Sequence, residues 1–96
     1  MKTPVDQLTN DQLDRLCAEF QGLVILPKNY HPTTDGAQFM DLLEKYKIEP
    51  KHYHGIGWNA YCPVNAYDGF GRGETASLVG CRAFVDAMTK GQGVER

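Results

Sequence analysis

The pattern of hydrophobic and polar positions predicts an amphipathic helix near the start of the chain. Thr9 and Gln12 have the spacing of a capping box, and Gly22 is a natural C-terminal stop. Between them, four apolar side chains recur at i, i+3, i+4 and i+7, which places them on one helix face: Leu13, Leu16, Cys17 and Phe20. We therefore predict a helix between Thr9 and Gly22.

A short apolar run follows this helix. Residues 23–26 read Leu-Val-Ile-Leu, which is too brief for a helix and predicts a strand buried on both faces and ended by Pro27. The polar and aromatic stretch 28–34 contains Pro32 and predicts a loop or an edge strand. A second helix is predicted from Asp35, which can act as its N-cap, to a point before Pro50. Its apolar stripe consists of Phe39, Leu42, Leu43 and Tyr46.

Loose alternation replaces the helical period between residues 52 and 62. Asn59 and Tyr61 fall on one face, and the opposite face carries Trp58, Ala60 and Cys62. This predicts a half-buried strand that Pro63 ends, preceded by another strand around residues 52–54.

Glycines mark the segment before the last helix. The pair Asp68-Gly69 predicts a turn, and the glycines of the run 69–73 predict a flexible loop. A third helix begins near Thr75 and ends at Gly91, and residues 91–96 form a polar tail that we expect to fray. Its single buried stripe consists of Leu78, Cys81, Val85 and Met88, with Phe84 flanking it.

Composition and charge narrow the classes of protein. The chain has 96 residues, enough for one domain spanning 1–96 with its core at about 8–90, and 42% of them are hydrophobic. The net charge of -2, with no basic stripe, disfavours nucleic-acid binding. A core this small is marginally stable, so a homodimer is a further option.

The cysteines and the N-terminal residues indicate the cellular compartment in which the protein is expected. Cys17, Cys62 and Cys81 are odd in number, far apart and without a CxxC pair, which predicts reduced thiols in a cytoplasmic protein. Cys62, beside Pro63, is the one expected to be exposed. The N-terminus lacks the apolar run of a signal peptide, and no segment approaches transmembrane length, so we expect no membrane partner.

Several blocks together resemble a known family. Residues 33–38 read Thr-Thr-Asp-Gly-Ala-Gln and are followed by Leu-Leu-Glu-Lys at 42–45 and by Ile48. Trp-Asn-Ala follows at 58–60, then Thr75 and Cys-Arg-Ala-Phe-Val at 81–85. In this order the blocks resemble phage NinX-like proteins and the related phage ABA-sandwich domains. One departure is Gly36, where many NinX-like members have Trp.

The resemblance implies a fold and an origin. The fold it implies is α/β (α+β), with a small, largely antiparallel sheet and three helices packed as an α-β-α sandwich. It also implies a phage or prophage origin. It supplies no catalytic role.

Two segments could hold an anion. Thr33, Thr34 and Asp35 precede a helix N-terminus, although capping alone explains these residue types. The glycine loop 69–73 could cradle a phosphate with Arg72, but it lacks the spacing of nucleotide-binding motifs, which favours simple loop flexibility. Arg72 between glycines should still be exposed and suited to contact a phosphate or a carboxylate.

Aromatic side chains gather in the strand and loop half of the chain. Trp58 should pack under a helix, whereas the surplus of Tyr with His and Arg is typical of a binding patch. On a strand, Asn59 and Tyr61 point away from Trp58, so one face packs while the other is free for recognition. The predicted ligand- or partner-binding residues are Tyr30, His31, Thr33, Thr34, Asp35, Asn59, Tyr61, Tyr67, Phe70 and Arg72.

Catalysis and metal binding are weakly indicated. His52 and His54 would share one strand face, with Cys62 or His31 completing a metal site, but the spacing is not that of a zinc site. No catalytic residue, metal ligand or cofactor motif is predicted.

The sequence therefore predicts a non-catalytic phage accessory protein that acts as a binding module. It would sequester or inhibit a component in the cytoplasm of the infected bacterial host, either a defence protein or a nucleotide-like small molecule. The alternatives are a small metal-dependent or nucleotide-processing enzyme centred on His52, His54 and Asp35, and a nucleic-acid-binding protein.

Overall fold

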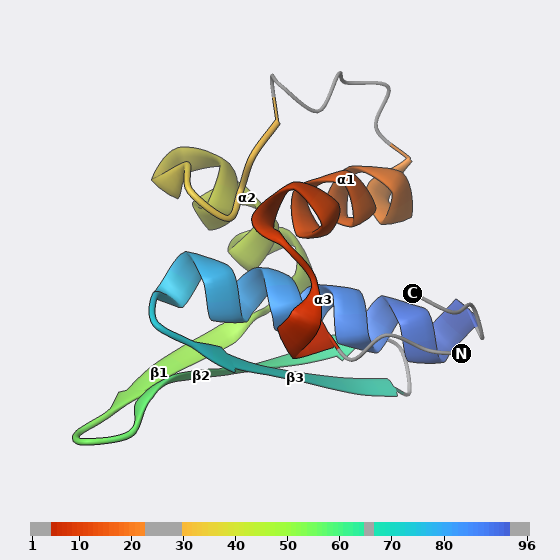
Figure 1. Cartoon of the computed structure of the whole chain (residues 1–96). Helices are drawn as coiled ribbons and strands as arrows, with labels where there is room; N and C mark the ends of the chain where they lie inside the picture. Colours follow the sequence, from red (N-terminus) through yellow and green to blue (C-terminus); the bar gives the residue numbers. More distant parts are fainter. Residues whose placement is uncertain (1–4, 23–29, 65–66, 93–96) are drawn as a thin grey trace.

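The computed structural model describes residues 5–22, 30–64 and 67–92. These residues form a 3-10 turn and three helices around a three-stranded sheet (Figure 1). In chain order the elements are η1 (Val5–Gln7), α1 (Asn10–Gln21), α2 (Gly36–Tyr46), β1 (Glu49–Tyr53), β2 (Gly57–Val64), β3 (Tyr67–Gly73) and α3 (Ala76–Gln92). The strand predicted at residues 23–26 and the end of the predicted tail, residues 93–96, lie outside the described residues.

The ends of α1 follow the sequence signals. The backbone N–H of Gln12 donates to Thr9 Oγ1 over 3.2 Å, and the backbone N–H of Thr9 donates to Gln12 Oε1 over 2.8 Å, which confirms the capping box. Gly22 adopts φ 71°, and its N–H donates to the carbonyls of Ala18 and Glu19. Both ends are therefore fixed by local chemistry.

The end of α2 lies before Pro50, as the sequence predicted. Lys47 adopts the left-handed conformation at φ 57° and ends α2 at Tyr46, well before Pro50. The chain enters β1 at Glu49, so Pro50 lies inside an edge strand, where it is tolerated. His54 falls in the turn between β1 and β2 and not in the strand predicted for it.

The sheet is antiparallel in the order β1-β2-β3. Ala60 and Cys62 are buried against the helices while Asn59 and Tyr61 lie on the other face, which confirms the predicted alternation. Pro63 does not end the strand, because β2 continues to Val64 and pairs with β3 along this length.

The glycine-rich segment 67–73 is a strand, so the predicted turn and flexible loop are wrong. Gly69, Gly71 and Gly73 alternate and share the sheet face turned towards α3. A Cβ added to Gly69 would meet the carbonyl oxygen of Ala83, and one added to Gly71 would meet that of Val79. The glycines are present because α3 lies against the backbone of β3, not because the chain turns there.

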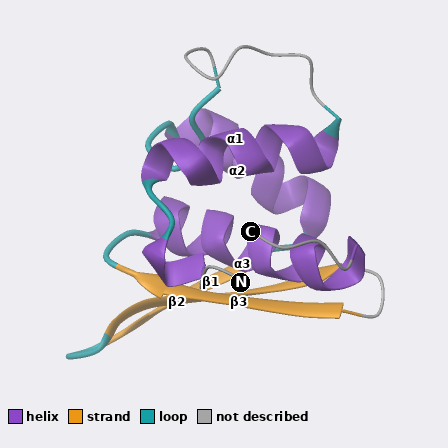
Figure 2. Cartoon of the chain, turned by 45° about the vertical axis from the view of Figure 1, so that its right-hand side comes forward, coloured by secondary structure: helices purple, strands orange, loops and turns teal. Residues whose placement is uncertain are grey.

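The helices form two layers on one side of the sheet. Figures 1 and 2 show α3 directly on the sheet, with α1 and α2 stacked on the far side of α3. The α+β class, with three helices and an antiparallel sheet, is confirmed, but the layer order is sheet, α3, then α1 with α2. None of the three described helices covers the other face of the sheet.

The central position of α3 explains its composition. Val79, Ala83 and Ala87 contact or approach the sheet, while the Phe84 ring lies 4.5 Å from that of Tyr46 at the end of α2. A helix enclosed from two sides is buried around most of its circumference, so the single stripe predicted from the sequence understates its buried surface. Its fully buried residues are Val79, Cys81, Ala83, Phe84, Val85, Ala87 and Thr89.

All three cysteines are free and buried. Burial of Cys17 and Cys81 agrees with the prediction, but the expected exposure of Cys62 is wrong. Cys62 faces α3 from the centre of β2, its Sγ lies 3.9 Å from the Tyr46 carbonyl oxygen, and burial raises its pKa to about 12. Within the described parts of the chain, no helix has the length and apolar character needed to cross a membrane.

Candidate functional site

One face of the sheet carries a set of polar and aromatic side chains that we call the open sheet face. The register pairs Lys51 with Asn59 and Asn59 with Arg72, so these side chains lie in one row across the three strands. A shallow hollow of about 320 Å³ lies over this face, and a neighbouring one of about 370 Å³ reaches Arg72 and Val5. The open sheet face consists of Glu49, Lys51, Tyr53, Asn59, Tyr61, Phe70 and Arg72.

Aromatic rings dominate this face. Phe70 is 57% exposed and Tyr53 is 46% exposed, which are high values for side chains within strands. The rings of Tyr61 and Phe70 are paired, with centroids 5.4 Å apart. The Tyr61 hydroxyl donates to Asp68 Oδ1 over 2.8 Å, and this hydrogen bond to a carboxylate raises the pKa of Tyr61. The rings are thus held in place rather than free to turn.

Side chains of α3 close the outer edge of β3. Arg82 Nη1 donates to the carbonyl of Arg72 over 2.6 Å, and the Phe70 N–H donates to Asp86 Oδ2 over 3.1 Å. One turn further along α3, Lys90 Nζ donates to the Asp68 carbonyl over 2.8 Å and pairs with Asp86 at 3.0 Å. Unpaired strand edges invite another strand, so these contacts block strand pairing along the outer edge of β3.

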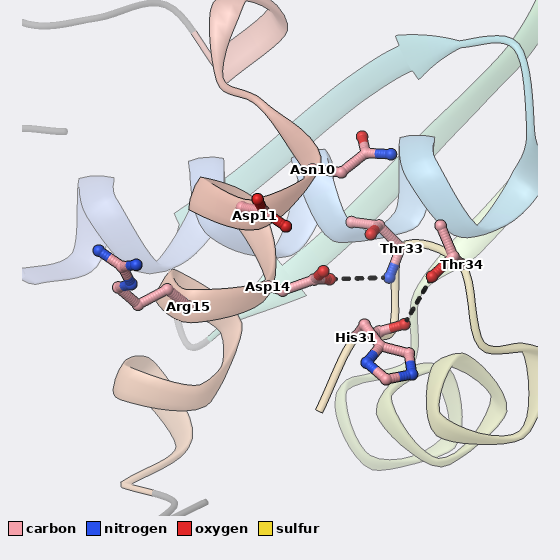
Figure 3. A pocket seen from close by; sticks show the side chains of 7 residues that line it. All are labelled: Asn10, Asp11, Asp14, Arg15, His31, Thr33 and Thr34. Atoms are coloured by element: carbon pink, nitrogen blue, oxygen red, sulfur yellow. Dashed lines mark hydrogen bonds between the residues drawn. The ribbon is translucent and has the colours of Figure 1, made fainter. Parts of the chain in front are cut away.

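A second candidate lies between α1 and the segment 31–34, and we call it the polar pocket (Figure 3). Its volume is about 600 Å³. It is lined by Asn10, Asp11, Asp14, Arg15, His31, Thr33 and Thr34.

Two groups in the polar pocket are almost fully buried. Asp14 is 5% exposed, and its Oδ1 accepts from the backbone N–H of Thr33 over 3.0 Å. Burial raises the pKa of the Asp14 carboxyl, and the backbone amide and the hydroxyl of Thr33 each oppose part of that rise. Thr33 is 4% exposed, and its Oγ1 makes no hydrogen bond of regular geometry with any described residue.

The predicted binding residues separate into two groups. Asn59, Tyr61, Phe70 and Arg72 belong to the open sheet face, whereas His31, Thr33 and Thr34 line the polar pocket. The two sets come from different layers of the fold, because the pocket lies beside α1 and the face lies beyond α3 (Figure 1).

Three of the predicted binding residues belong to neither site. Tyr30 is buried, its hydroxyl accepts from Gln21 Nε2 over 2.7 Å, and burial raises its pKa to about 12. Asp35 caps α2, accepting from the N–H of Gln38 over 3.0 Å, as the simple capping interpretation requires. Tyr67 is exposed at the start of β3, on the face shared with Gly69 rather than with Phe70.

The structure adds residues that the sequence did not single out. Glu49 and Lys51 complete the open sheet face from β1. Their i, i+2 spacing places both on one face of a strand, but only a strand that begins at Glu49 puts them there. Asp14 carries no signal in the sequence, because an acidic residue on an amphipathic helix is ordinarily solvated and its partner Thr33 is 19 residues away.

The histidines of the alternative metal site lie in neither the open sheet face nor one common cluster. The His52 ring packs 5.2 Å from that of Trp58, on the helix-facing side of the sheet, and His54 lies in the turn. Among the described residues, no three His, Cys, Asp or Glu side chains gather in a group able to hold a metal ion.

No model of a known protein family, no curated protein and no solved structure matches this chain. The resemblance to phage NinX-like and ABA-sandwich proteins therefore stays a prediction.

Proposed function

We propose that the protein is a non-catalytic binding module that docks a partner protein on its open sheet face. The observation that carries this proposal is the set of exposed rings on a sheet face that none of the described helices covers. Phe70 and Tyr61 form a paired aromatic anchor beside Arg72, and Tyr and Arg are the side chains most enriched at interface hot spots.

The charges of the face favour a protein over a nucleic acid. Lys51 and Arg72 are matched by Glu49 on the same face and by Asp68, which holds the Tyr61 hydroxyl. A nucleic-acid surface needs an excess of positive charge to neutralise phosphates. A face with both signs around apolar rings instead suits a protein of mixed charge.

The size of the face constrains how a partner docks. With strands about 4.8 Å apart and about 3.4 Å per residue, strands of 5, 8 and 7 residues give this face an outline of about 330 Å². A stable complex buries about 800 Å² on each partner, so the contact must extend beyond the strands. The hairpin tip between β1 and β2 offers that extension, because Ile56 is 79% exposed there. Ile56 is therefore a second anchor in the proposed interface.

The resemblance points to a setting for this activity. In an infected bacterium the partner would be a host protein, such as a defence component, which the module sequesters or inhibits. A nucleotide-like signal is the competing occupant, with Phe70 stacking on the base and Arg72 contacting the phosphate.

The test is affinity capture from bacterial lysate with the tagged full chain, followed by quantitative mass spectrometry. Phe70→Thr and Ile56→Thr remove the two anchors, and Met40→Gln, at a residue 51% exposed on α2, is the matched control. We expect one protein to be retained by the wild type and the control and reduced about 30-fold by Phe70→Thr, since a hot spot contributes about 2 kcal/mol or more.

Two outcomes would overturn the proposal. Equal capture by all four proteins would show that the open sheet face is not the interface. Native mass spectrometry against a panel of nucleotides provides the second readout. A nucleotide adduct that is lost in Arg72→Ala, with no captured protein, would instead establish a small-molecule sequestering function.

A further inference from the structure

The open sheet face contains two rows of side chains whose chemistry is complementary. The register places each row straight across the three strands. The first row consists of Glu49, Tyr61 and Phe70, and the second row, two residues away on every strand, consists of Lys51, Asn59 and Arg72. An acid thus lies beside a base on β1, and an aromatic ring lies beside a guanidinium on β3. The middle positions, on β2, are both uncharged.

A two-fold axis across the strands, midway between the rows, would bring the first row of one copy over the second row of another. Glu49 then faces Lys51 of the second copy, which allows an ion pair. Phe70 likewise faces Arg72 of the second copy, which allows a cation–π contact. Each contact occurs twice, as an interface between identical surfaces requires. The intervening residue of each strand belongs to the helix-facing side, so no side chain lies on the axis.

The edges of the sheet are less suited to joining two copies than its face. Along β3, Arg82 donates to the Arg72 carbonyl and Asp86 accepts from the Phe70 N–H, so α3 already uses backbone groups there. The opposite edge strand, β1, contains Pro50, which has no N–H to donate to an added strand. Pairing of two sheets edge to edge is therefore opposed on both sides.

We propose that two copies of this chain pack face to face through their open sheet faces, about this two-fold axis, as a reversible homodimer. The inference rests on the proposed function in one respect, since both make the open sheet face a surface for protein contact. It adds regulation to that function. Phe70 is covered in the dimer, so a host protein binds only the dissociated chain, and self-association controls access to the face.

The area of the face sets the strength of the dimer. An outline of about 330 Å² on each copy is well below the roughly 800 Å² that each partner buries in a stable complex. Contacts of this size belong to the weak, transient class, so we expect a dissociation constant that is micromolar or weaker. A dimer of this strength releases its copies to a partner that buries more surface.

Sedimentation equilibrium of the purified full chain, from micromolar to millimolar concentration, measures the dimer without a lysate. The wild type should show a monomer–dimer equilibrium that weakens at high salt, because the ion pairs are at the surface. Glu49→Lys and Lys51→Glu each turn two exposed attractive pairs into repulsive ones, so each should weaken the dimer about 10-fold. Glu19→Lys makes the same charge change at an exposed position of α1 and, as the matched control, should dimerise like the wild type.

Exchange of the charges between the rows is the decisive measurement. The double variant Glu49→Lys/Lys51→Glu restores opposite charges across the axis, so it should dimerise like the wild type. An equimolar mixture of the two single variants should form heterodimers, although neither variant pairs well with itself. Both positions are exposed, so the variants should keep the circular dichroism spectrum of the wild type. Should one single variant fail to fold, the other one and the double variant decide the outcome.

Three results would overturn the homodimer: a wild type that is monomeric throughout, a dimer that the single variants leave unchanged, or a double variant as weak as the single ones. Lysate capture is scored separately. A host protein lost in Phe70→Thr, together with a monomeric wild type, would overturn the homodimer and leave the proposed function standing. A dimer that obeys the charge exchange, together with equal capture by all variants, would overturn the proposed function alone.

Discussion

The contact of α3 with the backbone of β3 makes Gly69→Ala a severe test of the fold. The added methyl group would lie 2.5 Å from the Ala87 backbone nitrogen and 2.6 Å from its Cβ, besides overlapping the Ala83 carbonyl. The atoms it meets include backbone of a helix that is packed on its other side by α1 and α2, so rotation of a side chain cannot relieve the clash.

The expected loss of stability in Gly69→Ala is the difference between the cost of overpacking and the entropic gain of replacing a glycine. Overpacking a core costs about 1–3 kcal/mol, occasionally more, and this clash involves helix backbone, so we expect about 3 kcal/mol or more. The entropic gain from Gly→Ala in the unfolded chain is only about 0.4–1 kcal/mol. Each kcal/mol shifts the Tm of a domain of this size by about 4–8 °C, so the net loss should lower the Tm by at least about 8 °C.

Thermal and urea unfolding of Gly69→Ala, with Gly36→Ala as the matched control, provide the assay. At Gly36 no atom lies within 4 Å of an added Cβ and φ is not positive, so that variant should gain about 0.4–1 kcal/mol. If Gly69→Ala were as stable as the wild type, α3 would not lie against β3 as described and the explanation for the glycines would be wrong.

Three further predictions concern other parts of the molecule. Asp86→Ala removes the acceptor of the Phe70 N–H and the partner of Lys90. It should lower the free energy of unfolding in urea by about 1–3 kcal/mol and promote self-association, measured by light scattering. Unchanged stability and unchanged light scattering would argue against closure of the β3 edge by α3. Because Cys17 and Cys62 have raised pKa values and are buried, both should resist iodoacetamide at pH 8 until urea unfolds the chain, and rapid labelling of the native protein would contradict this. The folded pKa of Asp14 is raised above its ordinary 3.8, so the folded state binds protons there more tightly than the unfolded chain, and ionisation of Asp14 destabilises the fold as the pH rises from about 3.8. Over that rise the wild type should lose stability relative to Asp14→Asn in urea unfolding at several pH values. A parallel pH dependence of the two proteins would refute this.

Much of the fold was predictable where local chemistry decides it. The capping box at Thr9, the glycine stop at Gly22 and the alternation around Ala60 each depend on residues close together in the chain, and each is confirmed. The sequence predicted a loop for the glycines of β3, because a glycine that leaves room for a packed helix and a glycine that permits a turn have the same sequence neighbours. Only the tertiary position of α3 distinguishes the two.

The candidate sites likewise contain residues that local sequence places and residues that only tertiary contacts place. The placement of Asn59 and Tyr61 opposite Ala60 follows from the period of two of a strand. The burial of Tyr30 depends on Gln21, and the environment of Asp14 depends on Thr33, so neither is visible from neighbouring residues. Long-range pairings of this kind carry no periodic signal.

The central position of α3 also has a consequence for how the protein is made. The sheet and the pair formed by α1 and α2 contact each other chiefly through α3, which is the last described element to leave the ribosome. Until residue 92 has been synthesised, both layers expose the surfaces that α3 will cover. The 19 residues from 74 to 92 take about 1–4 s to synthesise at about 5–20 residues per second. The two layers therefore come together only once α3 is available, and chaperones have access to the glycine-lined face of β3 during that interval.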